Sequence, residues 1–574
     1  MIDTMKKLLL LSFCACFSLP MIAQQRYWVF FTDKGSDASL QLAHPEAFLS
    51  AEALAIREKQ QISPSIGDLP VYQGYMTQLR ALGIETYGSS RWLNAAVIDE
   101  SDILGLQGMG LSFVKGIRPL RRMGVAAAAF VTPQDVQESL GDPLTYGNAF
   151  IQNEMLHIRP LHERGFTGKG VRVAVFDAGF SGVDTIGAFD SLRLNKRILH
   201  TYDFVDKDTY VYEKSSHGTH VLSTFAAYKP GAMVGTAPEV SVILCRTEDA
   251  SSETQIEEYN WLRAMEWVDS IGVDIIHSSL GYTQFDDGVG SYTYEQIDGN
   301  TPIITRAADL AASRGIIVTV SAGNEGTDDW HYIAAPCDAD SVLCVGSVNK
   351  TGMKSSFSSF GPASDGQVKP DVTAMGERTT VASPNGKITT GNGTSYSAPL
   401  MAGFVACLRQ AHPKRSNMDI IQAVRLSADQ YLFPDEEYGY GIPDAVKADS
   451  LLSHVQDLST VTISMTAKPE RGTLSFAVPQ KPVLEIKDVA PVYTRSPKSQ
   501  VSLSNGRLEV KVPEGNTLNQ VTLYKDKLRV SVPASAISNQ GGTYSVKVSK
   551  FIPGEYYLEV VSDSFEERIP FVIP

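Results

Sequence analysis

Cysteine is scarce in this chain: there are six in 574 residues, and two of them lie in the apolar N-terminal leader. The others are Cys245, Cys337, Cys344 and Cys407. They are too few for a disulfide-stapled scaffold, and their spacing matches no metal-binding motif. Cys337 and Cys344 flank a short polar segment and could pair in an oxidising compartment. Cys245 and Cys407 lie in apolar runs, so we expect them to be buried free thiols.

The chain also lacks a cluster of basic residues. Its 50 Lys and Arg are outnumbered by 64 Asp and Glu, which gives a net charge of −14. Because nothing stands out that would neutralise phosphates, the composition argues against a nucleic-acid partner. With 43% apolar and 20% charged residues, the composition is that of a folded globular chain, and the length predicts several domains.

Apolar runs long enough to cross a membrane are absent, so no spanning helix is expected. The run at the start of the chain is short: Lys6-Lys7 precede an apolar stretch at 8–19, and Ala23 closes the segment. This is the order of a secretory signal peptide. We therefore expect residues 1–23 to direct export, with cleavage after Ala23 and a secreted or cell-surface product. The alternative is a lipoprotein signal at Cys14 or Cys16, which is disfavoured because Phe13 precedes Cys14 where a small residue is wanted.

Residues 24–122 are predicted to form a small α+β domain. Strands are expected at 27–32, near 92–99 and near 111–114, and helices around 45–59 and 71–82. Arg121-Arg122 and an alanine-rich stretch follow. Such small-residue segments pack poorly and are preferred sites of proteolytic nicking. Residues 123–167 then link this domain to a larger one at 168–455.

The region 168–455 alternates apolar strands with helices. Strands are predicted at 171–176, 240–245, 274–279, 315–320 and 342–348, and helices at 217–227, 254–270 and 301–313. Apolar strands with helical crossovers indicate an α/β fold, a doubly wound and mostly parallel sheet with helices on both faces. Ligands bind such sheets at the carboxyl ends of the strands. Asp177 follows the first strand and Asn324 follows the fourth, so both are expected at this edge.

A candidate nucleophile lies in the segment Gly-Thr-Ser-Tyr-Ser-Ala-Pro at 393–399. Leu400, Phe404 and Leu408 recur at helical spacing, which predicts that Ser395 lies in the first turn of a buried helix. Free backbone N–H groups and the helix dipole would favour an oxyanion beside the Ser395 hydroxyl. The alternative is a helix N-cap, the commoner use of a serine in such a place.

Two upstream segments complete a catalytic pattern with Ser395. Asp177 stands in Val-Phe-Asp-Ala-Gly, and His217 stands in Ser-His-Gly-Thr-His. The order Asp, His, Ser along the chain is that of subtilisin and not of chymotrypsin or the α/β-hydrolases. With Ser-Ala-Gly-Asn-Glu-Gly around Asn324, these motifs resemble those of the subtilisin-like serine peptidase family over about 168–448. The resemblance implies a catalytic triad and an asparagine that donates to the oxyanion.

An exported serine endopeptidase that works through an acyl-enzyme intermediate is the function that the resemblance implies. Ser279-Leu280-Gly281 resembles the family's substrate-binding segment, whose backbone pairs with an extended protein or peptide substrate. His220, the second histidine of its motif, is expected to be a packed helix residue. The alternative function is a catalytically inactive relative that acts in surface binding or adhesion, although no triad residue is missing.

The small domain at 24–122 resembles the propeptide of secreted family members, which assists folding and blocks the cleft as an intramolecular inhibitor. The alternative is an accessory domain that stays attached. No cofactor is required by the implied reaction. Structural calcium occurs in many relatives, and Asp286-Asp287 and Asp298-Gly299-Asn300 are candidates, but neither has a recognisable ligand spacing.

Acidic residues gather between Glu248 and Glu258, where the family forms one wall of the cleft. A charge run is usually a solvated face. Here it also suggests a preference for basic side chains before the scissile bond.

From residue 456 to 574 the pattern changes to short alternating runs punctuated by Pro, Gly, Asn and Ser. This pattern predicts an all-β sandwich of antiparallel strands. Its last third, around Ile552 to Leu558, resembles the sorting domain of the type IX secretion route of Bacteroidetes, which implies that secretion machinery as a partner. The usual basic ending is replaced by Phe571-Val572-Ile573-Pro574.

Overall fold

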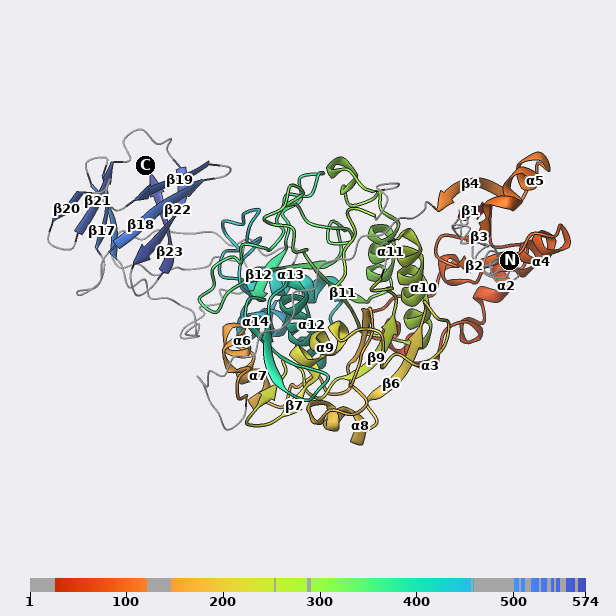
Figure 1. The fold of residues 1–574 in the computed structure, drawn as a ribbon, viewed down its shortest axis with the longest axis horizontal. Helices are drawn as coiled ribbons and strands as arrows, with labels where there is room; N and C mark the ends of the chain where they lie inside the picture. Colours follow the sequence, from red (N-terminus) through yellow and green to blue (C-terminus); the bar gives the residue numbers. More distant parts are fainter. Residues whose placement is uncertain are drawn as a thin grey trace, which may run out of the picture.

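The computed structural model describes residues 26–120, 146–251, 254–285, 291–455, 458 and the strands between residues 500 and 573. The predicted signal peptide, the junction at Arg121-Arg122 and the calcium candidates Asp286-Asp287 lie outside the described residues. Along the chain the described elements form an N-terminal unit, a large central unit and a C-terminal group of strands (Figure 1).

The N-terminal unit is a four-stranded antiparallel sheet with helices, as predicted. The strand order is β2-β3-β1-β4. Its elements are β1 (Arg26–Phe31), α2 (Ala38–Leu42), α3 (Ala51–Lys59), α4 (Gln73–Ala81), β2 (Thr86–Ser90), β3 (Ala95–Asp99), α5 (Ile103–Gly108) and β4 (Val114–Leu120). Val29, Phe31, Leu79 and Ile98 belong to a core of its own. The unit therefore has the apolar interior of a small independent domain.

Several elements of this unit differ from the prediction. Strand β4 begins at Val114, where the strand predicted near 111–114 was expected to end, and α2 and α5 were not predicted. Helix α3 begins at Ala51 and not near residue 45, because Ser50 Oγ accepts a hydrogen bond from the N–H of Ala53 at 3.1 Å and caps the helix there. Strand β2 was not predicted, since its sequence Thr-Tyr-Gly-Ser-Ser has no apolar alternation.

The central unit is built on a seven-stranded sheet with the order β13-β12-β11-β10-β5-β9-β6. All of its pairings are parallel, which confirms the predicted α/β sheet. Its strands are β5 (Arg172–Asp177), β6 (Ile198–Asp203), β9 (Ser241–Arg246), β10 (Ile275–Ser278), β11 (Ile317–Ser321), β12 (Leu343–Val348) and β13 (Val372–Met375). Strands β6 and β13 were not predicted, because β6 is an only partly buried edge strand and β13 has four residues.

Helices cover both faces of this sheet. Along β5, Val173 and Val175 belong to one buried cluster, and Ala174 and Phe176 belong to the other. The first cluster includes residues of α6 (Phe150–Met155), α7 (Arg159–Glu163), α8 (Asp190–Leu194), α9 (His217–Ala226), α12 (Thr394–Ala411), α13 (Asn417–Ser427) and α14 (Ala445–His454). The second includes residues of α10 (Gln255–Ile271) and α11 (Ile303–Ala312). The alternation along a strand thus separates the two helical layers.

Two short antiparallel hairpins complete the central unit, β7 (Tyr228–Lys229) with β8 (Met233–Val234) and β14 (Thr379–Ala382) with β15 (Ile388–Gly391). Among the described helices, none is both long enough and apolar enough to cross a bilayer.

The C-terminal strands form two antiparallel four-stranded sheets, with orders β16-β17-β21-β20 and β19-β18-β22-β23. They are drawn in blue in Figure 1. Their bounds are β16 (Gln500–Ser504), β17 (Arg507–Lys511), β18 (Leu518–Lys525), β19 (Leu528–Pro533), β20 (Ser538–Gln540), β21 (Thr543–Lys547), β22 (Gly554–Ser562) and β23 (Glu566–Ile573). The all-β composition predicted from the alternating runs is therefore present.

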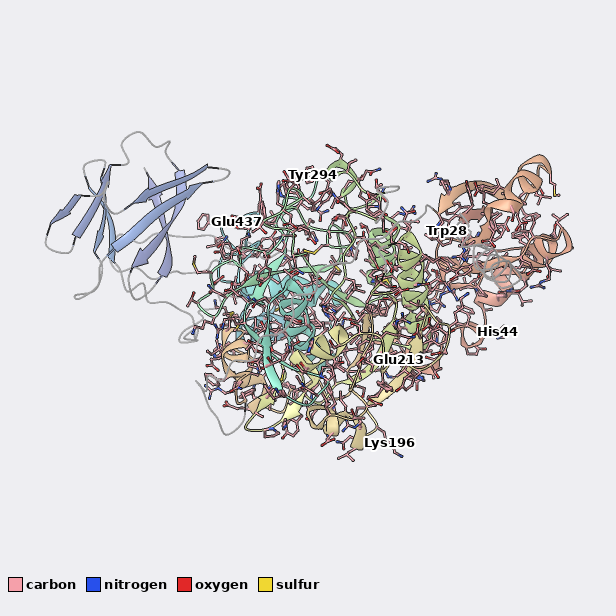
Figure 2. The ribbon with its side chains drawn as sticks, viewed as in Figure 1. Trp28, His44, Lys196, Glu213, Tyr294 and Glu437 are labelled. Carbon is pink, nitrogen blue, oxygen red and sulfur yellow. A yellow bond between two sulfur atoms is a disulfide. The ribbon has the colours of Figure 1, made fainter. Side chains whose placement is uncertain are left out.

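The N-terminal sheet packs against the second helical layer of the central unit. Trp28, labelled in Figure 2, is 1% exposed, and its ring centroid lies 5.5 Å from that of Tyr259 in α10. Trp92 and Leu120 belong to the same buried cluster as α10 and α11. The two units therefore share a continuous apolar contact.

Buried charges surround this apolar contact. Arg57 bonds both Asp68 of its own unit, at 2.8 Å, and Asp269 of α10, at 2.7 Å. Arg314 of the central unit reaches across to Asp68 at 2.8 Å, and Arg91 pairs with Asp269. Asp68 thus contacts one guanidinium from each unit, and Asp269 contacts two guanidinium groups from the N-terminal unit.

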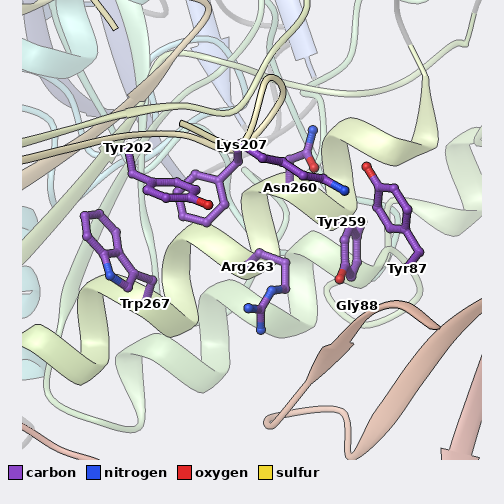
Figure 3. A pocket seen from close by; sticks show the side chains of 9 residues that line it. Tyr87, Gly88, Tyr202, Lys207, Tyr259, Asn260, Arg263 and Trp267 are labelled. Carbon is purple, nitrogen blue, oxygen red and sulfur yellow. The ribbon is translucent and has the colours of Figure 1, made fainter. Parts of the chain in front are cut away.

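A pocket of about 350 Å³ opens beside the same contact (Figure 3). It is lined by Tyr87, Gly88, Tyr202, Phe204, Lys207, Tyr259, Asn260, Arg263 and Trp267. Lys207 Nζ lies 3.9 Å from the centroid of the Tyr87 ring, so the pocket is bounded by residues of both units. None of the candidate catalytic residues lines it.

Candidate active site

Strand β5 ends in Asp177, which is completely buried, and α9 begins with His217. His217 Nδ1 lies 2.9 Å from both carboxyl oxygens of Asp177. Asp177 Oδ1 also accepts a hydrogen bond from the N–H of Ala178 at 2.8 Å. Because a carboxylate can only accept, this contact places the imidazole proton on Nδ1 and the lone pair on Nε2. That is the tautomer that can act as a base.

Ser395 lies in the first turn of α12, as predicted. The helix begins at Thr394, and its N-cap residue is Gly393, whose φ of 153° favours glycine. Ser395 is therefore inside the helix and does not cap it. Its side chain is in a largely buried position, 8% exposed, and its Oγ donates to the carbonyl oxygen of Ser279 at 3.4 Å.

Asn324 follows β11 and is tied to the same helical turn. Its Oδ1 accepts a hydrogen bond from the N–H of Thr394 at 2.9 Å and lies 3.1 Å from Thr394 Oγ1, whose hydroxyl is shared with the Gly323 carbonyl at 3.0 Å. With Oδ1 engaged, the amide NH₂ is the end of the side chain that can donate to a ligand. Thr394 was not predicted to have a role, although it stands directly before Ser395; only the three-dimensional contact reveals that it orients Asn324.

The first turn of α12 contacts both Asn324 and the side of the site that carries His217. Thr394 contacts Asn324, and the ring centroid of Tyr396 lies 6.2 Å from that of His217. The structure thus brings residues of β5, α9, β11 and α12 to the carboxyl edge of the parallel sheet, the edge predicted to bind a ligand.

Ser279-Leu280-Gly281 follows β10 at this same edge. Gly281 is exposed, and the next residue, Tyr282, exchanges backbone hydrogen bonds with Ala335 at 2.8 and 3.1 Å. The Ser279 side chain is buried and donates to the carbonyl oxygen of Ser395 at 2.9 Å. The segment was predicted to offer its backbone to a substrate, and this side-chain contact was not foreseen.

His220 is a packed residue of α9, as expected. It is 5% exposed, and its Nε2 lies 3.4 Å from Ser383 Oγ. Burial, and secondarily the neighbouring His217, lower the pKa of His220 to about 4. It is therefore uncharged near neutral pH.

Three acidic residues of this segment, Glu248, Glu257 and Glu258, are buried and do not form the solvated face that was predicted. Glu248 accepts a hydrogen bond from the Tyr282 hydroxyl, and Glu258 accepts one from Tyr292 at 2.7 Å; both glutamates are buried. Glu257 bonds the N–H of Thr254 at 2.8 Å and so caps α10. Burial raises the pKa of Glu258 to about 8 and also raises the pKa of Glu248. Carboxyl groups that retain their protons attract basic side chains weakly.

Asp298, a calcium candidate, uses its carboxylate locally. Its Oδ1 accepts from the N–H groups of Asn300 and Thr301 at 3.0 and 2.6 Å, and its Oδ2 accepts from Thr301 Oγ1 at 2.8 Å. Within the described part of the chain, no three His, Cys, Asp or Glu side chains gather as metal ligands would.

The cysteines are arranged as the sequence suggested. Cys337 and Cys344 form a disulfide. Cys245 and Cys407 are buried free thiols. The disulfide ties Cys344 of β12 to Cys337, which lies two residues after Ala335, the partner of Tyr282.

Comparison with known proteins gives family matches for both the N-terminal unit and the central unit. Residues 168–441 match the model of the subtilase family, Peptidase_S8, and residues 26–130 match that of the Peptidase S8 propeptide domain of Bacteroidota. The chain is 30% identical over 320 residues to subtilisin NAT of Bacillus subtilis subsp. natto, covering 55% of this chain and 74% of that protein. It is 32% identical over 286 residues to a subtilisin of Bacillus pumilus, covering 49% of this chain and 92% of that protein. The solved structure of the prenylagaramide maturation protease PagA covers 51% of this chain and 98% of its own, with 21% identity and a TM-score of 0.41.

Proposed function

Because this chain belongs to the subtilase family of serine peptidases, we propose that it is an exported endopeptidase whose nucleophile is Ser395. His217 takes the proton of the Ser395 hydroxyl as the oxygen attacks the scissile carbonyl. Asp177 holds the imidazole in the required tautomer and stabilises the imidazolium. The observation that supports these roles best is the contact of His217 Nδ1 with both oxygens of the fully buried Asp177, at 2.9 Å each.

The oxyanion of the tetrahedral intermediate would form between Asn324 and the backbone N–H of Ser395. Asn324 is exposed at the sheet edge, while its Oδ1 is held by Thr394. An amide NH₂ fixed in this way costs no reorganisation when charge develops on the substrate oxygen. Collapse of the intermediate returns the proton from His217 to the leaving amine and leaves an acyl group on Ser395, which water then removes.

The substrate in this proposal is an extended segment of a protein or peptide. Ser279-Leu280-Gly281 leaves β10 at the edge that carries Ser395, and an extended chain can add to such a segment through main-chain hydrogen bonds. Apart from the substrate and the hydrolytic water, every group in the proposed reaction belongs to the chain itself, so no cofactor is required; calcium would have a structural role only.

The N-terminal unit is proposed to be an intramolecular inhibitor that is removed after folding. It is packed on α10 and α11, and β4, its last strand, ends at Leu120 in a cluster shared with these helices. The chain therefore leaves this unit beside the central one. Export through residues 1–23, and the use of type IX secretion machinery by the C-terminal strands, are further parts of the proposal that rest on the sequence patterns.

The test is the hydrolysis of a protein substrate by mature enzyme and by the Ser395→Ala variant. We expect wild-type protein to cleave internal peptide bonds and to react with a fluorophosphonate at Ser395. The Ser395→Ala variant should lose the labelling and at least 10³-fold in turnover, because the attacking oxygen is absent. Ser397→Ala is the matched control, since Ser397 lies on the same turn and donates to the carbonyl of Thr394 at 3.0 Å. Full activity of the Ser395→Ala variant would refute the proposal.

A further inference from the structure

The helix that carries Ser395 lacks one hydrogen bond in its first turns. In an α-helix the carbonyl of residue i accepts from the N–H of residue i+4. For Ser395 that residue is Pro399, which lies inside α12 and has no N–H. The Ser395 carbonyl is thus left without its normal helical donor, although Ser395 itself is 8% exposed. A buried carbonyl in this situation requires another partner.

Ser279 supplies that partner. Its Oγ lies 2.9 Å from the Ser395 carbonyl oxygen and is the donor. In return, Ser395 Oγ donates to the Ser279 carbonyl at 3.4 Å. The two serines are therefore joined at two points, and one of these points is the oxygen proposed to attack the substrate.

His277 holds the Ser279 hydroxyl. His277 lies on β10 in register with Thr319 of β11, and it is completely buried. Its Nε2 is 2.8 Å from Ser279 Oγ, and its Nδ1 is 3.0 Å from Thr319 Oγ1. Because the single hydroxyl proton of Ser279 is donated to Ser395, the bond from His277 must be an Nε2–H donation. Nδ1 then accepts from the Thr319 hydroxyl at 3.0 Å, which is the shorter of that hydroxyl's two contacts, since the Ile276 carbonyl oxygen lies 3.4 Å away.

The imidazole stays neutral, which this arrangement needs. Burial, and to a smaller extent the neighbouring His217, lower the pKa of His277 to about 3. Each group in this series therefore donates to the next: Thr319 to His277, His277 to Ser279, and Ser279 to the Ser395 carbonyl.

We propose that His277 is a positioning residue that fixes the Ser395 carbonyl, and with it the nucleophile, through the Ser279 hydroxyl. The inference rests on the proposed role of Ser395. His277 does not touch the substrate; it sets the direction of the Ser279 hydroxyl, which replaces the helical N–H that Pro399 lacks. Loss of this support moves the Ser395 side chain and its backbone N–H, both of which must be aligned in the transition state.

The experiment compares four variants of the full-length chain after maturation: His277→Leu, His277→Gln, Ser279→Ala and the double variant His277→Leu/Ser279→Ala. Active sites are counted by fluorophosphonate labelling, and kcat and KM are measured with one peptide substrate. We expect kcat of His277→Leu to fall about tenfold to a hundredfold, the range for small misplacements, with KM within twofold of wild type. Glutamine places an amide N–H near the position of Nε2, so His277→Gln should recover at least half of that loss on a logarithmic scale.

Coupling separates this role from a general packing effect. If His277 acts through Ser279, the double variant should have nearly the kcat of the worse single variant, because the second change removes an interaction that is already lost. His162→Leu is the matched control: His162 also bridges two residues, Tyr146 at 2.8 Å and the Thr236 carbonyl at 2.9 Å. It should leave kcat within twofold of wild type.

A second arm restores the missing donor. In a Pro399→Ala background, the new N–H can bond the Ser395 carbonyl, so adding Ser279→Ala should lower kcat by less than threefold. Unchanged kcat in His277→Leu, multiplicative losses in the double variant, or an undiminished Ser279→Ala effect with Pro399→Ala would each overturn the inference. Should His277→Leu fail to fold, Ser279→Ala and the Pro399→Ala pair still decide it. These outcomes differ from failure of the proposed function, in which Ser395→Ala itself would remain active.

Discussion

Arg57 of the N-terminal unit and Asp269 of α10 form an ion pair in which both side chains are only 3% exposed, with Nη2 2.7 Å from Oδ1. Arg57 also holds Asp68, and Arg314 of the central unit bonds Asp68 from the other side. Removing one member of such a pair leaves an uncompensated buried charge, which is far more costly than losing a surface contact.

We therefore expect Arg57→Met to weaken inhibition by the separated N-terminal unit at least a hundredfold, the equivalent of about 3 kcal/mol. The measurement is the inhibition constant of a folded 24–122 fragment added to mature enzyme. Glu52→Gln is the matched control, because Glu52 pairs with Arg172 across the same contact at 3.6 Å but is 53% exposed. Its effect on the inhibition constant should be less than about fivefold, because an exposed ion pair contributes little. Equal effects of the two substitutions would show that burial of the network contributes nothing.

Asn324 and Thr394 give a graded prediction for the oxyanion site. Asn324→Ala should lower kcat about 10²–10³-fold with little change in KM, the loss found in subtilisin for the corresponding asparagine. Thr394→Val removes one of the two donors that orient Asn324 Oδ1 and should cost about fivefold to tenfold in kcat.

The double variant Asn324→Ala/Thr394→Val distinguishes orientation from an independent role of Thr394. It should be no slower than Asn324→Ala alone, because Thr394 acts through the asparagine. Thr185→Val, which removes an exposed hydroxyl bonded to Gly182, should leave kcat unchanged. A multiplicative loss in the double variant would contradict the proposed orientation.

Glu258 makes stability depend on pH. Burial raises its pKa to about 8, from an ordinary value of about 4.3. Between these values the folded chain keeps the proton and the unfolded chain releases it, so folding stability must fall as pH rises through this window. Glu258→Gln should reduce the loss of unfolding free energy across this window by on the order of 2 kcal/mol.

The comparison is made with urea unfolding at pH 5.5 and 8.0, in the Ser395→Ala background to prevent self-digestion. The parent protein, with Glu258 intact, should have a lower urea midpoint at pH 8.0 than at pH 5.5. The Glu258→Gln variant should show a smaller drop in this midpoint. Glu163→Gln, whose side chain is 63% exposed, should keep the full drop. Identical pH slopes for Glu258→Gln and its parent would contradict the prediction.

The disulfide between Cys337 and Cys344 closes a small loop, since the two residues are 7 apart in sequence. Replacing both with alanine should lower the unfolding free energy by about 2 kcal/mol, the loop-closure contribution at this size. Dithiothreitol should destabilise the parent protein by a similar amount and leave the double variant unaffected. If dithiothreitol destabilised both proteins equally, its effect would not come from reduction of the Cys337–Cys344 disulfide.

The sequence patterns located the site because two of its residues stand near element boundaries that a neighbouring glycine marks. Asp177 ends an apolar strand shortly before a glycine, and Ser395 lies two residues after a glycine, in the first turn of an apolar helix. Contacts made by side chains across the fold carried no such signal. Ser279 was predicted from its neighbours to bind substrate, but its hydroxyl serves Ser395 because Pro399 lies four residues further along α12.

The acidic segment shows the other limit of the sequence patterns. A one-dimensional charge run does not reveal that Tyr282 and Tyr292, which are distant in sequence, supply hydroxyl donors that make burial of Glu248 and Glu258 tolerable. Strand β2 was missed for a related reason, since pairing with β3 and not apolar alternation makes it a strand.

Gln60, at the end of α3, satisfies two backbone groups of the central unit. Its Nε2 donates to the carbonyl of Gly315 at 2.8 Å, and its Oε1 accepts from the N–H of Asn417 at 2.9 Å. Asn417 is the first residue of α13, where a helix has no internal partner for its N–H groups. When the N-terminal unit departs, water must replace the glutamine, and the protection of this amide against deuterium exchange falls. The exchange rate at Asn417 therefore records, independently of any substrate, whether the N-terminal unit is still bound.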